Sequence, residues 1–299
     1  MAVFEQVTER IAVTDPVTGE TIGDFPVMLP DEVCAAVDRA RAAQPAWEAR
    51  GTSERAALLA AWNNALWDDQ ANAIQIIRRE TGKNRGSAYV EIALIDSTVQ
   101  YYASHAPRLL RPQSRRPAFP IRQRARVYDK PHGVAGFITP WNYPLLNALF
   151  DAIPALIAGN AVIIKPSEAT PFTAKYAIDL MHRVGIPRDV VQMVTGDGRT
   201  GEALVDSVDY ISLTGSTATG RKVAVRAAQR LIPYSLELGG KDPLIVLKDA
   251  DLDLAASGAL TAAMENAGQT CVSIERVYVE APIYDAFLDR VQHYAAQIK

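Results

Sequence analysis

The chain has 299 residues, of which 31 are Lys or Arg and 34 are Asp or Glu, giving a formal net charge of −3. This near balance argues against a protein built mainly to bind nucleic acid or an anionic membrane. A hydrophobic share of 48% and a charged share of 22% exclude a disordered chain, and the length allows about two domains.

No membrane or secretory segment is visible in the sequence. The first residues lack the apolar run of a signal peptide. The longest apolar stretch, residues 145–164, is interrupted by Asn147, Asp151 and Pro154, so it does not qualify as a simple membrane span. Because there are only two cysteines, we expect no disulfide framework and a cytoplasmic location.

The N-terminal third is predicted to be mainly helical after short extended pieces in residues 1–30. Asp31 is expected to cap a helix that runs to about residue 44. Further helices are expected from Ser53 into the early seventies and over residues 87–110. The buried face of the first helix is expected to hold Val33, Ala36, Val37 and Ala40.

A basic, proline-containing segment follows. Residues 108–130 hold eight basic groups and one acid, Asp129. Within it, residues 121–127 alternate, which predicts an exposed strand or hairpin with arginines on one face. A nucleic-acid patch is the alternative, but alternating arginines also protect a sheet edge, and the balance of the whole chain favours this simpler interpretation.

Beyond residue 132 the chain alternates between strands and helices. Strands are expected at 133–138, 161–165, 190–194 and 209–214. Helices are expected at 143–158, 171–184, 199–207 and 217–230. A second α/β unit follows, with strands at 243–247 and 276–280 and helices at 252–267 and from residue 282 onward. This alternation predicts a Rossmann-like parallel sheet with helices on both faces, whose ligands lie at the carboxyl ends of the strands.

Polar residues follow the first two of these strands. Asn142, in Pro140-Trp141-Asn142-Tyr143-Pro144, could aim its amide at an oxyanion or simply serve a turn. Lys165 and Glu168 could hold the ribose hydroxyls of a nucleotide, or form only a surface ion pair.

Two glycine-containing segments follow the next strands. Residues 196–201 match G-x-G-x-x-G between a strand and a helix, but no acid ends the following strand, which leaves Glu168 as the candidate ribose ligand. The segment containing Gly215 and Ser216 could bind a phosphate at a helix N-terminus, or form an ordinary N-cap.

Two reactive groups stand out near the second unit. Glu237 lies in an apolar strand beside two glycines, where poor solvation would favour a general base; a partly exposed Glu is the alternative. Cys271 lies in a Gly-Gln-Thr loop and is a candidate nucleophile, whereas Cys34 fits a buried structural cysteine better. The sequence contains no zinc-ligand spacing, so no metal is expected.

Together, these segments resemble the NAD(P)-dependent aldehyde dehydrogenase superfamily. The matching pieces occur in the family's order over essentially the whole chain; they are Pro140-Trp141-Asn142-Tyr143-Pro144, Lys165-Pro166-Ser167-Glu168, Thr214-Gly215-Ser216, Glu237-Leu238-Gly239-Gly240-Lys241 and Gly268-Gln269-Thr270-Cys271.

The resemblance implies a covalent mechanism. Cys271 would attack an aldehyde, Asn142 would hold the oxyanion, and Glu237 would activate water to release a carboxylic acid. The cofactor would be NAD, since Glu168 opposes the extra phosphate of NADP, although some relatives accept both. The residues that would hold the cofactor are Lys165, Glu168, Trp141, Gly198, Gly215 and Ser216.

The resemblance also bears on substrate and assembly. Relatives that use succinic semialdehyde carry an Arg where this chain has Phe150, which favours an apolar or aromatic aldehyde. The implied domains are a dinucleotide-binding domain (1–111 and 132–238), an oligomerisation hairpin (112–131) that supports a homodimer or tetramer, and the start of an incomplete catalytic domain (239–299). A catalytically inactive nucleotide-binding remnant or interaction protein is the alternative.

Overall fold

The computed structural model describes residues 9–119 and 121–298. Contacts divide the chain into two compact units, Met1–Glu237 (unit 1) and Leu238–Lys299 (unit 2). Each unit has its own apolar cluster and is described by itself. The extended segment predicted for residues 1–8 lies outside the described residues.

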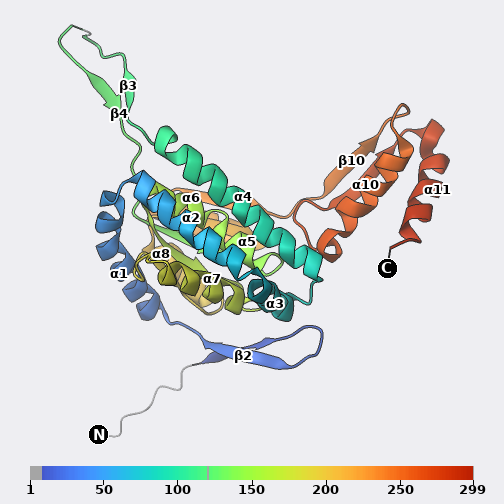
Figure 1. Ribbon diagram of the computed structural model, residues 1–299, viewed down its shortest axis with the longest axis horizontal. Helices are drawn as coiled ribbons and strands as arrows, with labels where there is room; N and C mark the ends of the chain where they lie inside the picture. Colours follow the sequence, from blue (N-terminus) through green and yellow to red (C-terminus); the bar gives the residue numbers. More distant parts are fainter. Residues whose placement is uncertain (1–8, 120, 299) are drawn as a thin grey trace, which may run out of the picture. The chain divides into compact units, whose positions relative to one another are not determined.

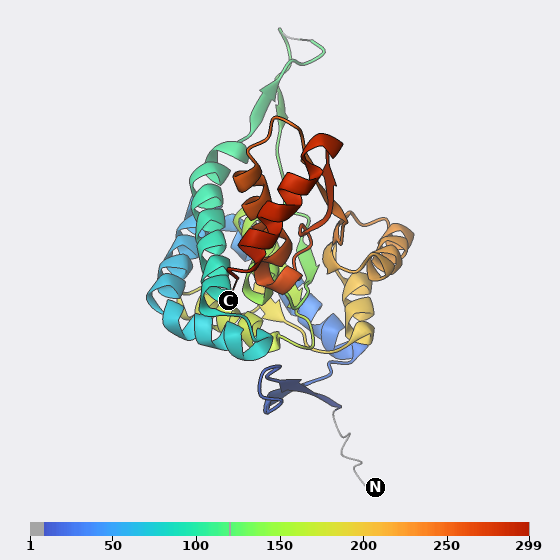
Figure 2. The same ribbon diagram turned by 90° about the vertical axis from the view of Figure 1, so that its right-hand side faces the viewer.

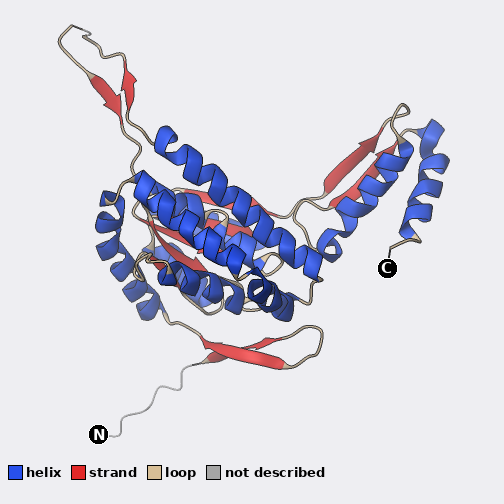
Figure 3. Cartoon of the chain, viewed as in Figure 1, coloured by secondary structure: helices blue, strands red, loops and turns tan. Residues whose placement is uncertain are grey.

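A five-stranded sheet forms the centre of unit 1, in the order β7-β6-β5-β8-β9. Figure 3 shows strands of unit 1 in red among the blue helices. Its strands are β5 (Val134–Ile138), β6 (Ala161–Lys165), β7 (Val191–Met193), β8 (Tyr210–Gly215) and β9 (Tyr234–Leu238). The pairs β5–β6, β5–β8 and β6–β7 are parallel, which confirms the predicted α/β fold. The chain leaves β5 in one direction and returns to its other side with β8, so a crevice is expected between the ends of these two strands.

Helices cover both faces of the sheet, which is why β6 is buried along its whole length (Figures 1 and 2). One face carries α1 (Pro30–Ala49), α8 (Gly198–Ser207) and α9 (Thr217–Arg230). The other carries α5 (Pro144–Leu149), α6 (Ala152–Ala158) and α7 (Pro171–Arg183). Over these pack α2 (Thr52–Asp68), α3 (Gln70–Thr81) and α4 (Arg85–Leu109).

The first predicted helix is present, but its start differs. Leu29, not Asp31, is the N-cap, and its N–H donates to the Glu32 carboxylate. The four residues predicted for the buried face are all buried. Cys34 is exposed and its Sγ lies 3.3 Å from Ser207 Oγ, so the prediction of a buried structural cysteine was wrong. It neighbours Val33 in sequence, but one residue turns an α-helix by about 100°, enough to leave the apolar face.

Two predicted helices prove to be interrupted. The helix expected from residue 53 ends at Asp68, and α3 begins directly after Asp69. The helix expected over 143–158 is split into α5 and α6. Pro154 explains the second break, because proline has no N–H to donate to the carbonyl of Phe150 and is accommodated in the first turn of a new helix.

Two hairpins extend from the sheet-and-helix body of unit 1. Strands β1 (Arg10–Thr14) and β2 (Thr21–Pro26) form the first. The basic arm contains β3 (Gln113–Arg115) paired antiparallel with β4 (Ala125–Val127) (Figure 1). Its second strand is shorter than predicted, because Arg122 and Gln123 donate their N–H groups to Phe119 O and so belong to a turn.

Unit 2 is a small α/β motif. Its elements are β10 (Asp242–Val246), α10 (Leu252–Met264), η1 (Glu265–Gly268), β11 (Ile274–Val279), η2 (Ala281–Ile283) and α11 (Tyr284–Ala295). The two strands are parallel, as the β-α-β pattern predicts. Among the described residues, no helix of either unit is both long and apolar enough to cross a membrane.

Candidate active site

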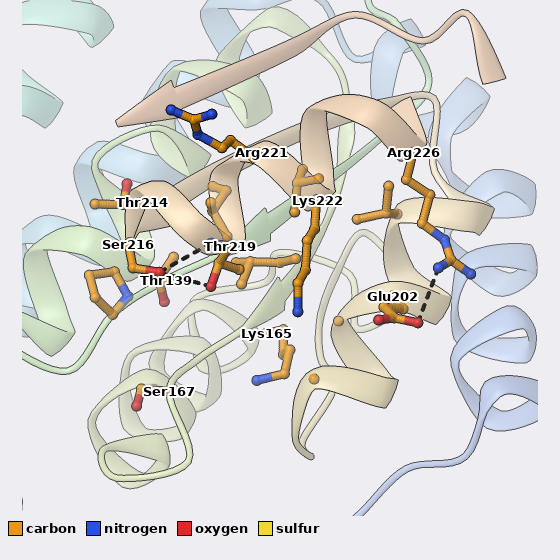
Figure 4. Close-up of a pocket in the computed structure, with 18 of the residues that line it drawn as sticks. Thr139, Lys165, Ser167, Glu202, Thr214, Ser216, Thr219, Arg221, Lys222 and Arg226 are labelled. Carbon is orange, nitrogen blue, oxygen red and sulfur yellow. Dashed lines mark hydrogen bonds and ion pairs between the residues drawn. The ribbon is translucent and has the colours of Figure 1, made fainter. Parts of the chain in front are cut away.

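A groove of about 870 Å³ lies at the carboxyl ends of the strands of unit 1 (Figure 4). Its walls come from the segments after β5, β6 and β8 and from α8 and α9. All six residues predicted to hold the cofactor line it: Trp141, Lys165, Glu168, Gly198, Gly215 and Ser216. The sequence therefore located this groove, and the functions of the six residues remain proposals.

Lys165 and Glu168 form a polar pair in the groove. Lys165 Nζ donates to Glu168 Oε1 at 3.0 Å and to the carbonyl of Pro166 at 3.2 Å. The Lys165 side chain is almost fully buried, whereas that of Glu168 is 40% exposed. This is not an ordinary surface pair, because the ammonium end lies inside the wall while the carboxylate faces the open space.

Each glycine of residues 196–201 has a different environment. Gly196 has a φ of +145°, and a Cβ there would lie 2.0 Å from Thr200 Oγ1, so only glycine fits. Gly201 is buried, and a Cβ there would lie 3.6 Å from Lys165 Cδ, in ordinary contact. At Gly198 a Cβ would meet nothing within 4 Å, because this residue faces the groove.

The start of α9 forms another wall. Ser216 is the N-cap, and its Oγ accepts from Thr219 N at 3.2 Å and lies 2.9 Å from Thr219 Oγ1 (Figure 4). The N-cap predicted as one alternative is therefore formed. The two functions are compatible, since a capped helix N-terminus still carries the partial positive charge that attracts phosphate.

Basic side chains of α9 also line the groove, and the sequence analysis did not single them out. Arg221, Lys222 and Arg226 all belong to the wall, and Lys222 extends from α9 toward the side where Lys165 lies (Figure 4). Arg226 is held by Asp206 at 2.6 Å and Glu202 at 3.1 Å. The spacing of Thr219, Lys222 and Arg226 on one helical face was a usable signal.

One buried polar atom of the groove wall has no partner among the described residues. Thr139 directly follows β5 and is 7% exposed, and its Oγ1 makes no hydrogen bond there. Buried hydroxyls are normally hydrogen-bonded, so this atom suits a ligand that supplies a donor or acceptor. A ribose hydroxyl of a dinucleotide can donate to it or accept from it, and a phosphate oxygen can accept its proton.

Asn142 lies in the segment that joins β5 to α5. Asn147 Nδ2 donates to Asn142 Oδ1 at 3.2 Å. This bond fixes the oxygen end of the Asn142 amide and places the donor Nδ2 at the opposite end. The amide is therefore held in one orientation, as an oxyanion donor requires.

Glu237 is the fourth residue of β9, at the edge of the sheet. Its side chain is exposed, so the alternative of an exposed Glu is confirmed and that of a poorly solvated carboxylate is wrong. The reason is the position of β9, because an edge strand is covered less completely than a central one.

Cys271 belongs to unit 2 and is exposed. It follows Asn266, Ala267 and Gly268, which are all left-handed, with φ values of 51°, 59° and 75°. Such a conformation costs about 1–2 kcal/mol for a residue with a side chain, and strained backbone often occurs at functional sites. The described residues of both units contain no cluster of three or more His, Cys, Asp or Glu side chains placed to hold a metal ion.

A parallel sheet with helices on both faces and a groove at its strand ends defines a Rossmann-like α/β protein. The chain belongs to the aldehyde dehydrogenase family, since the model described as "Aldehyde dehydrogenase family" matches residues 3–299. Solved structures agree: an NADP-dependent enzyme of Escherichia coli has a TM-score of 0.93 and 38% identity over 97% of this chain and 60% of its own.

Other relatives carry more specific names. A Mycolicibacterium smegmatis protein named "Putative succinate-semialdehyde dehydrogenase", with NADP(+) as its cofactor, is 42% identical over 90% of this chain and 52% of its own length. An NAD-dependent benzaldehyde dehydrogenase of Corynebacterium glutamicum has a TM-score of 0.90 and 33% identity over 95% of this chain and 63% of its own. This chain thus spans about half to three fifths of the length of such relatives.

Proposed function

We propose that this protein oxidises an aldehyde to a carboxylic acid, with NAD or NADP as the hydride acceptor. The observation that carries the proposal is the groove, which unites all six predicted cofactor residues in a protein of the aldehyde dehydrogenase family. The exposed Cys271, after a strained turn in unit 2, supplies the nucleophile.

The groove suits a dinucleotide. Ser216 and the start of α9 would hold the pyrophosphate, Lys165 and Glu168 the adenosine ribose, and Trp141 and Gly198 would flank the adenine. Thr139 Oγ1 supports this assignment, because it is a buried groove atom that has no partner among the described residues. The bound nicotinamide would accept the hydride.

The protein's own groups would perform the remaining chemistry. The Cys271 thiolate forms a C–S bond to the aldehyde carbon, and the new oxyanion is held by Asn142 Nδ2 and the backbone N–H of Cys271. Loss of hydride from that carbon leaves a thioester. Glu237 then takes a proton from water as the water adds to the thioester, and cleavage of the C–S bond releases the acid and the thiolate.

Cofactor preference is set by opposing charges in the groove. Glu168 disfavours the additional phosphate of NADP, whereas Lys222 and Arg221 attract it. The relatives are named for both cofactors. We propose that both bind, and dissociation constants measured by calorimetry test this.

The substrate is proposed as a carboxylated semialdehyde. The succinate-semialdehyde names of the relatives in Mycolicibacterium smegmatis and Escherichia coli support it and disagree with the apolar aldehyde favoured by Phe150, whose side chain is half exposed at the end of α5. The benzaldehyde dehydrogenase of similar structure favours the apolar aldehyde instead. Comparing kcat/KM for succinic semialdehyde and benzaldehyde decides between them. A higher kcat/KM for benzaldehyde would favour the apolar or aromatic substrate that Phe150 predicts.

Assembly and location belong to the same proposal. The exposed β3–β4 arm would pair protomers into a homodimer or tetramer, and the site of action would be the cytoplasm. Residues 239–299 would belong to the catalytic domain. Sedimentation of the chain with and without residues 112–131 tests the role of the arm.

Aldehyde-dependent NADH or NADPH formation by the purified chain is the main test. Cys271→Ala should abolish turnover and leave cofactor binding intact. Cys34→Ala is the matched control, because Cys34 is also exposed yet lies on α1, and it should leave turnover unchanged. Folded protein that binds cofactor without turnover would favour the alternative, a catalytically inactive nucleotide-binding protein.

A further inference from the structure

A buried ion pair lies outside the residues assigned to catalysis. Lys83, just before α4, and Glu91, within α4, are joined by a bond of 2.7 Å from Nζ to Oε1. Their side chains are only 5% and 0% exposed. Such a pair is costly to desolvate and is weak evidence of stabilisation, so the other contacts of these two groups are informative.

Those contacts all reach the segment that carries Asn142. Lys83 Nζ donates to the carbonyl of Asn142 at 2.7 Å and lies 4.4 Å from the centre of the Tyr143 ring. Glu91 Oε2 accepts the N–H groups of Leu145 at 2.9 Å and Leu146 at 3.1 Å. The pair therefore holds both ends of residues 142–146, which lie more than fifty positions away in sequence.

These bonds fix the backbone on which the Asn142 amide depends. The Lys83 bond fixes the peptide that follows Asn142, and the Glu91 bonds fix the first turn of α5. That helix also carries Asn147, whose side chain orients the Asn142 amide. A shift of this segment would displace Asn142 Nδ2, although every side chain that lines the groove would still be present.

We propose that Lys83 and Glu91 are positioning residues that hold Asn142 where it meets the oxyanion. The proposal rests on the proposed function and adds two groups to it. Neither residue would touch substrate or cofactor; both would act through the Asn142 segment. A misplacement of about 1 Å can cost on the order of 100-fold in rate, so the expected loss is in kcat.

A matched control exists in the same unit. Glu80, near the end of α3, is also a buried carboxylate that binds the start of another helix. It accepts the N–H groups of Phe172 at 2.6 Å and Thr173 at 2.8 Å, at the start of α7. It makes these bonds to α7 and not to the Asn142 segment. Glu80→Gln and Glu91→Gln are therefore the same chemical change, and only the second should disturb Asn142.

The experiment compares steady-state kinetics of the wild type, Glu91→Gln, Lys83→Arg, Lys83→Met, Glu80→Gln and Asn142→Ala. Glu91→Gln should lower kcat about 10–100-fold while the Kd for NAD(P) and the alkylation rate of Cys271 stay within about twofold. Lys83→Arg, which keeps the charge, should retain more activity than Lys83→Met. Glu80→Gln should keep the wild-type kcat. Wild-type kcat in Glu91→Gln and Lys83→Met, with Asn142→Ala impaired, would overturn the proposal and leave the function standing.

Amide hydrogen exchange tests the positioning without turnover. In Glu91→Gln, the peptide covering residues 142–146 should exchange faster than in the wild type, while β6 stays protected. In Glu80→Gln, the faster exchange should occur at the start of α7 instead. Unchanged exchange at residues 142–146 in Glu91→Gln would overturn the proposal, even if the wild-type chain showed no turnover and the proposed function failed.

Discussion

Units 1 and 2 bury their strands to very different extents. In unit 1, β6 is fully buried between helical layers. In unit 2, β10 and β11 are also parallel, but only Val246 of the two strands is fully buried. Large exposed apolar side chains of unit 2 include Ile245, Leu247, Leu254, Met264, Val272 and Val277. Parallel sheets are normally covered on both faces. Because these side chains are exposed, unit 2 has a much smaller apolar core than unit 1.

This difference shows how the proposed chemistry is supported. The groove belongs to unit 1, whose apolar core is large, and this favours a preformed site for the proposed cofactor. Unit 2, which contains Cys271, has a cluster whose buried members are Val246, Ala256, Ala259 and Phe287. Segments with few buried contacts open at lower free energy, so we expect unit 2 to open before unit 1.

The largest expected effect comes from the two cores. Ile163→Ala in β6 should lower the free energy of unfolding of unit 1 by about 2–5 kcal/mol. Phe287→Ala should loosen unit 2 and leave unit 1 nearly unchanged. Tryptophan fluorescence in urea separates the units, because all four tryptophans, residues 47, 62, 67 and 141, belong to unit 1. An equal shift of the fluorescence midpoint in both variants would contradict the comparison.

Glu80 should make the stability of unit 1 depend on pH. Burial raises the pKa of Glu80 from 4.5 to about 7, against the lowering effect of its hydrogen bonds from Phe172 and Thr173. The folded state therefore holds the proton more tightly than the unfolded chain, so this contribution is complete below pH 4.5 and is lost as pH rises to about 7. The loss is about 3 kcal/mol. As pH rises across this range, the urea midpoint should fall less steeply in Glu80→Gln than in the wild type. The same fall in both proteins would show that Glu80 is not the origin of the pH dependence.

A cofactor variant tests whether binding is a property of unit 1 alone. Glu168→Ala should shift the ratio of NADP to NAD affinity toward NADP by about tenfold, since removing one nearby negative charge changes phosphate binding by about 1–2 kcal/mol. Cys271→Ala should leave both affinities unchanged. Calorimetric titration of the two variants is the measurement, and loss of cofactor affinity in Cys271→Ala would show that unit 2 contributes to the site.

The smallest effects are expected from surface ion pairs in either unit. Arg226 pairs with Asp206 at 2.6 Å in unit 1, and Arg290 with Asp253 at 3.1 Å in unit 2. Partly exposed pairs contribute about 0–1 kcal/mol. Arg226→Ala and Arg290→Ala should therefore each lower the free energy of unfolding by at most about 1 kcal/mol. Thermal melts followed by circular dichroism provide the check. A larger loss in Arg290→Ala would mean that unit 2 depends on charge more than on burial.

Much of the fold followed from short-range patterns. The apolar runs at β5, β6 and β8, each followed by a helix, predicted the parallel sheet because a strand buried on both faces must be apolar throughout. The same patterns did not show the break between α5 and α6, where the missing N–H of Pro154 outweighs a favourable apolar period. They also misplaced Cys34, whose helical phase left it on the exposed side of α1.

The sequence by itself determined the parallel α/β fold and the six residues that line the groove, and it singled out Cys271 as a candidate nucleophile, because strand ends and polar loops are marked by local composition. Only the tertiary structure decided which groups surround them. It exposed Glu237 on an edge strand, brought Lys222 into the groove, and joined Lys83 and Glu91 to the Asn142 segment. These outcomes depend on helices packing over a sheet, and contacts between residues far apart in sequence leave no local pattern to detect.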